Sequence, residues 1–96
     1  MPSEKGTEEM SGFPLDLDGL YLWAEEMMWA GRLVEIDHAL AKAEIKDLSD
    51  DILIGLLTAT LPVRSKLPSR KRFCEDVERT IKERGTWENG LLVGLE

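Results

Sequence analysis

The sequence predicts an all-α protein, a compact array of four main helices followed by a short C-terminal segment. Three observations support this prediction. Apolar residues recur every three to four positions along most of the chain, glycine or proline follows three of the four periodic stretches, and polar capping residues precede the third. The 96 residues suffice for one domain with one modest core, and a deep substrate cavity beside such a core is not expected.

Residues 1–14 are rich in glycine, proline, serine and glutamate, which predicts a flexible tail before a single helical domain over residues 15–96. The first helix is expected over residues 17–30 and should end at Gly31. Its expected core face comprises Leu17, Leu20, Tyr21, Ala24, Met27 and Met28. A second helix is expected over residues 33–43, and the short break predicts an antiparallel helical hairpin.

Ser49 is the expected N-cap of a third helix, and the two aspartates that follow favour the positive end of the helix dipole. The body of this helix, over residues 52–61, is apolar nearly all round, which predicts a central position. Pro62 should end or kink it. A fourth helix is expected over residues 69–84, closed by glycine, and residues 86–96 should form a short helix or an extended segment that returns to the core.

Composition narrows the class of protein. Apolar residues make up 43% and charged residues 32%, the balance of a globular domain. Cys74 is the only cysteine, so no intramolecular disulfide is expected, and a lone thiol is typical of a reducing compartment. The chain shows neither a signal-peptide pattern nor an apolar run of roughly 20 residues. We therefore expect a cytoplasmic protein that does not associate with membranes.

Residue types that support catalysis are sparse. His38 is the only histidine, and its neighbour Asp37 points about 100° away from it around a helix. One histidine and one cysteine do not make a zinc site, and the acids of residues 47–51 lack the calcium-loop pattern. Cys74 follows three basic residues that could lower the pKa of its thiol, but its apolar neighbours favour a small buried residue. We expect no enzyme, no cofactor and no metal.

Two surface features could bind a partner. The first is the outer face of the first helix, where an apolar pair seven positions apart is surrounded by acids, as in many protein-binding hot spots. This face comprises Asp18, Leu22, Glu25, Glu26 and Trp29. In the alternative interpretation, another helix or the C-terminal segment covers it.

The second feature is a basic segment over residues 64–72. Its bases are Arg64, Lys66, Arg70, Lys71 and Arg72. We rank ion pairing with the acidic N-terminal half or a second subunit first, an acidic protein partner second, and nucleic-acid phosphates third. Nucleic acid ranks last because the net charge is −7 and no aromatic residues are interleaved with the bases.

Charge is unevenly distributed along the chain. Residues 1–52 hold 13 acids and 4 bases, a net charge of −9, whereas residues 53–96 hold 6 acids and 8 bases, a net charge of +2. Such an uneven charge distribution orients two proteins relative to each other as they associate. The sequence thus predicts a non-catalytic protein-interaction or adaptor module, such as a small accessory or inhibitor protein, whose partner is another protein or a second copy. The alternative is a helical nucleic-acid-binding protein that uses the basic segment.

Overall fold

The structure is a computed structural model that describes residues 13–96, so most of the tail predicted over residues 1–14 lies outside it. Helices account for most of the described chain, and no strand occurs within it. The elements are α2 (Leu17–Trp29), α3 (Leu33–Lys42), the 3-10 helix η1 (Ile45–Asp47), α4 (Asp50–Thr60), the 3-10 helix η2 (Leu61–Lys66) and α5 (Pro68–Arg84). The predicted all-α fold with four main helices is confirmed.

Local capping explains why the helices begin and end where they do. The Asp16 carboxylate accepts a hydrogen bond from the Gly19 amide (2.8 Å), and the Ser49 hydroxyl oxygen accepts one from the Ile52 amide (3.3 Å). Gly85 adopts a φ of 79° and ends α5 in the left-handed conformation that glycine tolerates best. After Thr60 the chain tightens into η2, with Pro62 in its first turn.

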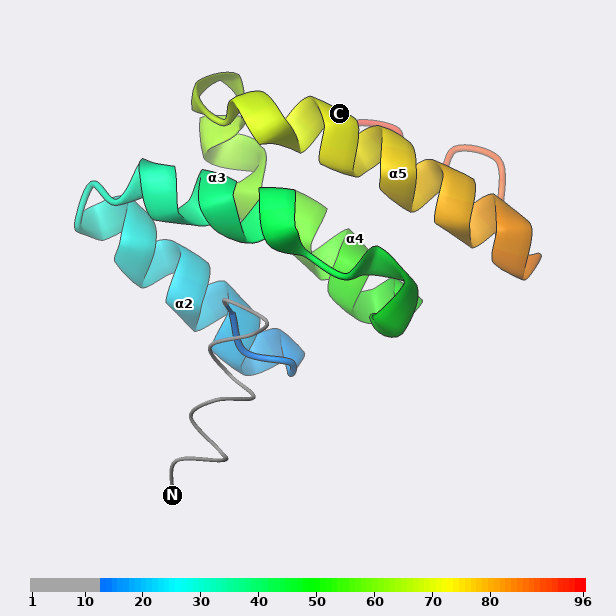
Figure 1. Ribbon diagram of the computed structural model, residues 1–96, viewed down its shortest axis with the longest axis horizontal. Coiled ribbons are helices and arrows are strands. Elements are labelled where there is room, and N and C mark those ends of the chain that lie inside the picture. The colour runs from blue at the N-terminus through cyan, green and yellow to red at the C-terminus, as the bar shows by residue number, and fades with distance from the viewer. Residues whose placement is uncertain (1–12) are drawn as a thin grey trace.

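The α3 and α4 helices lie between α2 and α5 (Figure 1). α2 packs mainly on α4, and α3 packs mainly on α5, so the two helices of the first hairpin each bury more against another helix than against each other. α4 contacts both α2 and α5, and its side chains Leu53, Leu56 and Leu57 are fully buried. The predicted central position of this helix is correct.

Gly55 allows α2 to approach α4 closely. A β-carbon built at this glycine would lie 2.8 Å from the Leu17 Cδ2 atom and 3.2 Å from the Leu20 Cδ2 atom. Glycine in a helix interior costs about 1 kcal/mol relative to alanine. That cost is offset by the close crossing of two helices, which also fixes the orientation of α2.

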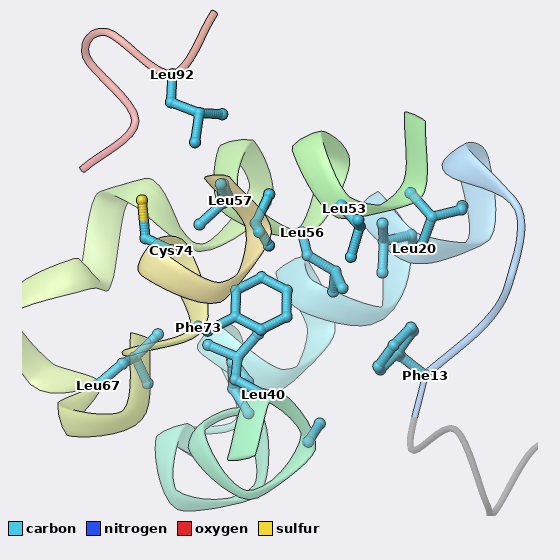
Figure 2. Close-up of a cluster of buried hydrophobic side chains, with 14 of the residues drawn as sticks. Phe13, Leu20, Leu40, Leu53, Leu56, Leu57, Leu67, Phe73, Cys74 and Leu92 are labelled. Carbon is cyan, nitrogen blue, oxygen red and sulfur yellow. The ribbon is translucent and has the colours of Figure 1, made fainter. Parts of the chain in front are cut away.

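One expectation about the N-terminal region was wrong, and another was right only in part, because four residues of the predicted core face of α2 pack in the core and two do not. Phe13 belongs to the core rather than to the tail (Figure 2). Its ring centroid lies 5.9 Å from that of Trp23. The core face of α2 is accordingly rotated toward Trp23, while Tyr21 remains 42% exposed and Leu17 is exposed as well. Helical periodicity does not reveal this rotation, because the contact with Phe13 comes from outside the helix.

The C-terminal segment (residues 86–96) is neither of the two forms that the sequence left open, a short helix or an extended segment. Three hydrogen bonds between residues three apart form successive turns, from the amides of Leu91, Val93 and Leu95. Leu92 is fully buried and points down over the region of Leu57 and Cys74 (Figure 2). The segment therefore does return to the core, but through tight turns.

Candidate functional site

The outer face of α2 is open to solvent. All five residues predicted there are exposed, with Leu22 at 55% and Trp29 at 84% exposure. The two apolar side chains lie about 10 Å apart along the helix axis. Within residues 13–96 neither a further helix nor the C-terminal segment covers this face, because Leu92 is anchored elsewhere.

The acids of this face have no internal partner among the described residues. Asp18, Glu25 and Glu26 take part in none of the ion pairs found between residues 13 and 96. Their negative charges therefore remain available to a partner. Sequence reasoning missed Val34, which is strongly exposed in the first turn of α3, shortly after the glycine turn. The sequence does contain a signal for its exposure, because Val34 is an apolar residue that lies outside the periodic apolar pattern of α3.

The basic segment divides into one buried and four exposed side chains. Arg64, Lys66, Lys71 and Arg72 are exposed, whereas Arg70 is only 3% exposed. Arg70 donates from Nε to the Thr60 hydroxyl oxygen (2.8 Å) and from Nη2 to the backbone carbonyls of Leu57 (2.6 Å) and Leu95 (2.5 Å). Arg70 thus does not belong to an exposed basic patch.

Arg70 instead joins three parts of the fold. The Leu57 carbonyl is in the last turn of α4, where carbonyls lack helical partners and the helix dipole is negative. The Leu95 carbonyl belongs to the C-terminal segment, so the same guanidinium holds that segment in place. Burial, followed by the nearby Arg64 charge, lowers the pKa of Arg70, although an arginine remains protonated.

The first turn of α5 receives its cap from α3. The Asp37 carboxylate accepts hydrogen bonds from the Ser69 amide (2.7 Å) and the Ser69 hydroxyl (3.1 Å). A carboxylate at this position offsets the unfavourable cations near the start of the helix. Asp37 is thereby directed away from His38, which is exposed. This contact could not be predicted from local sequence patterns, because the two residues are 32 positions apart.

The internal ion pairing that we ranked first for the basic segment is not seen within residues 13–96. None of its four exposed bases forms an ion pair there. The two halves of the chain are instead joined by Arg84, which donates to the Asp50 carboxylate (2.7 Å) and to the carbonyls of Ile45 and Lys46. A hydrogen bond from the Thr86 hydroxyl (2.7 Å), then the one from Arg84, lowers the pKa of Asp50.

Cys74 is a buried apolar residue of the core cluster. Burial, followed by the Glu96 charge, raises the pKa of its thiol, which disfavours the reactive thiolate. The surroundings of Cys74 are therefore those of a small hydrophobic residue, as in the second interpretation of this cysteine.

Comparisons with known proteins give no information about function, so the proposal below is based on the geometry of the structure. No protein-family model, no curated protein and no solved structure matches the chain. In the described range, no three side chains of histidine, cysteine, aspartate or glutamate are grouped so as to hold a metal ion. None of the helices described there has the length and apolar character needed to cross a membrane.

Proposed function

We propose that the protein is a non-catalytic module that binds another protein through the outer face of α2. The observation that carries this proposal is the exposure of Trp29 on an ordered helix beside a second exposed apolar residue, Leu22. An exposed indole is unfavourable in water, and tryptophan is among the residues that contribute most to binding when a partner covers them.

Charge defines the chemistry of the partner. Three carboxylates without internal partners in the described chain surround the apolar pair. The complementary surface has an apolar pocket for the indole and a rim of lysine or arginine side chains. Such a module acts by covering a basic surface of its partner, as an accessory or inhibitor protein does.

The fold supports binding because α2 is already formed and anchored. The close crossing at Gly55 and the capping bond from Asp16 hold the helix in one orientation. Little backbone entropy is then lost when the partner binds, since only side chains such as Trp29 become ordered. The surface is thus preorganised for a rigid docking mode.

The nucleic-acid alternative is less well supported. Arg70, one of its five proposed contacts, is used inside the fold, and Glu75 and Glu78 lie in the same groove as Arg64 and Lys71. Acids close to the bases weaken the attraction to phosphates. We therefore keep nucleic-acid binding only as an outcome of the experiment below.

Affinity capture with matched variants tests the proposal. The Leu22→Ser/Trp29→Ser variant removes both apolar anchors, and Val93→Ser removes an equally exposed apolar side chain from the C-terminal segment. We expect the purified partner to bind wild type and Val93→Ser alike, and to bind the double variant at least tenfold more weakly, a loss of about 1.4 kcal/mol. Raising the salt concentration should slow association with wild type.

Three results would change the conclusion. Equal binding of the partner by all three proteins removes α2 as the interface. If light scattering shows association of wild type but not of Trp29→Ser, the partner is a second copy of the chain. Salt-sensitive binding to nucleic acid that disappears when Arg64, Lys66, Lys71 and Arg72 become glutamine favours the alternative.

A further inference from the structure

A groove of about 590 Å³ lies between η2, the first half of α5 and the end of the C-terminal segment. This volume is within the range of small-molecule binding sites. The buried side chains Leu67 and Cys74 contribute apolar surface to it. The groove does not include any residue of α2, so it is separate from the proposed protein-binding face.

Arg70 lines this groove with Arg64 and Lys71. Its three hydrogen bonds within the described chain come from Nε and Nη2, and none comes from Nη1. Arg70 lines the groove, so its positive charge contributes to the electrostatic potential there. The residue is only 3% exposed, and its three hydrogen bonds hold the guanidinium in place.

Charge is arranged along the groove from positive to negative. Arg64 and Lys71 line the end near η2 together with Arg70, and neither forms an ion pair with a described carboxylate. Further along α5, Glu75 and Glu78 line the groove. A helical rise of about 1.5 Å per residue separates Arg70 from Glu78 by about 12 Å. Glu96 also lines the groove, but it follows Leu95, whose carbonyl accepts a hydrogen bond from Arg70, so it lies at the Arg70 end.

We propose that this groove binds an organic acid with a single carboxylate and an apolar chain. The carboxylate accepts hydrogen bonds from the exposed side chains of Arg64 and Lys71, and the buried Arg70 adds positive charge at the same end of the groove. The chain of the ligand covers Leu67 and Cys74. Glu75 and Glu78 then face the far end of the ligand, which they prefer to be neutral or positively charged.

Three acids of equal length test the charge pattern. Octanoate has a methyl group at its far end, 8-aminooctanoate an ammonium group, and suberate a second carboxylate. We expect 8-aminooctanoate and octanoate to bind, and suberate to bind at least fivefold more weakly than either because of the acids at the far end. Titrations followed by two-dimensional NMR report the site directly, since the Arg70 Nε–H group is held by Thr60 and gives its own signal.

A pair of matched double variants identifies the residues involved. Arg64→Gln/Lys71→Gln removes both bases of the groove, whereas Lys66→Gln/Arg72→Gln removes two exposed bases of the same segment that do not line it. Both variants change the net charge equally, and neither touches Arg70. We expect the first to raise the Kd for octanoate about five- to tenfold, as for two solvent-exposed charges, and the second to change it less than twofold.

Specific results would overturn the proposal. It fails if octanoate and 8-aminooctanoate leave the Arg70 Nε–H signal and the Cys74 amide signal unchanged. Equal weakening by the two double variants would show general attraction to positive charge rather than a site, and equal binding of suberate would remove the assigned role of the acids. None of these outcomes bears on the α2 face.

Discussion

Arg70 and Asp37 are charged side chains that cap helices other than their own. Each lies far along the sequence from at least one of its partners, and each supplies atoms that a helix end lacks. The sequence showed Arg70 as one base among five, because a run of bases does not reveal which of them points inward. The sequence therefore identified the basic segment, but it did not reveal that Arg70 is buried and has a structural role.

Replacing Arg70 tests its internal role. Arg70→Met keeps an apolar stem of similar length but leaves the Thr60 hydroxyl and two carbonyls without their donor. We expect the free energy of unfolding, measured by urea denaturation, to fall by about 3 kcal/mol. Lys66→Met, at an exposed base of the same segment, should change it by less than about 0.5 kcal/mol. Similar values for both variants would contradict the assigned contacts.

Asp50 gives a prediction about pH. Its pKa is lowered in the folded protein, chiefly by the hydrogen bonds from Thr86 and Arg84, whereas in the unfolded chain it is normal. Its contribution to stability is therefore complete above the unfolded value, near pH 4, and is lost as the pH falls through the lower folded value. We expect Asp50→Asn to destabilise by about 1 kcal/mol at pH 7, a modest value because the pair is partly exposed.

The same comparison in acid is the check on this mechanism. Once the Asp50 carboxylate of wild type is protonated, denaturation curves of wild type and Asp50→Asn should converge. Asp51→Asn serves as the control, because this neighbour is exposed and accepts no side-chain hydrogen bond within residues 13–96. A destabilisation by Asp50→Asn that persists unchanged in acid would point to packing rather than to charge.

At the scale of the helices, local signals in the sequence predicted the boundaries well. Ser49, Gly31 and Gly85 act through backbone groups within a few residues, so their effect is visible without tertiary structure. The core face of α2 and the shape of the C-terminal segment depend on contacts with distant elements, such as Phe13 on Trp23. Those features could not be read from periodicity alone.

The crossing of α2 and α4 gives a prediction at this scale. Gly55→Val places a branched side chain where even a β-carbon would meet Leu17 and Leu20. We expect a loss of about 1–3 kcal/mol in the free energy of unfolding from overpacking. Thr58→Val puts the same side chain at an exposed position of the same helix and should have little effect. Equal effects of the two changes would show that the crossing of α2 and α4 can accommodate a larger side chain at position 55.

At the scale of the whole molecule, the two candidate surfaces differed in how far the sequence defined them. The α2 face lies on a single helix, so its five residues followed from helical spacing, and all five are exposed. The groove lined by Arg64 and Lys71 is built from η2, α5 and the C-terminal segment. Its lining residues are spread over about thirty positions of the chain, and only packing brings them together. The sequence therefore predicted its bases without predicting the groove.

The C-terminal segment gives a prediction about the whole fold. It is anchored by the Leu92 side chain and by the bond from Arg70 to the Leu95 carbonyl, and it lies close to Cys74. Leu92→Ala should loosen this anchor and raise the rate at which a thiol reagent modifies Cys74 by about tenfold or more, through local opening. Val93→Ala, at an exposed neighbour, should leave the rate unchanged. No acceleration in Leu92→Ala would mean that the segment does not control access to the thiol.

The surroundings of the three tryptophans have a spectroscopic consequence. The Trp23 ring packs at a tilt against Phe13, and the centre of the Trp87 ring lies 5.0 Å from the Lys82 ammonium group, so both indoles have neighbours within the protein. Trp29 is largely hydrated and should dominate the red edge of the fluorescence emission as well as the fraction quenched by iodide. Intrinsic emission can then report occupancy of the α2 face without an added dye, through a blue shift and a loss of quenching.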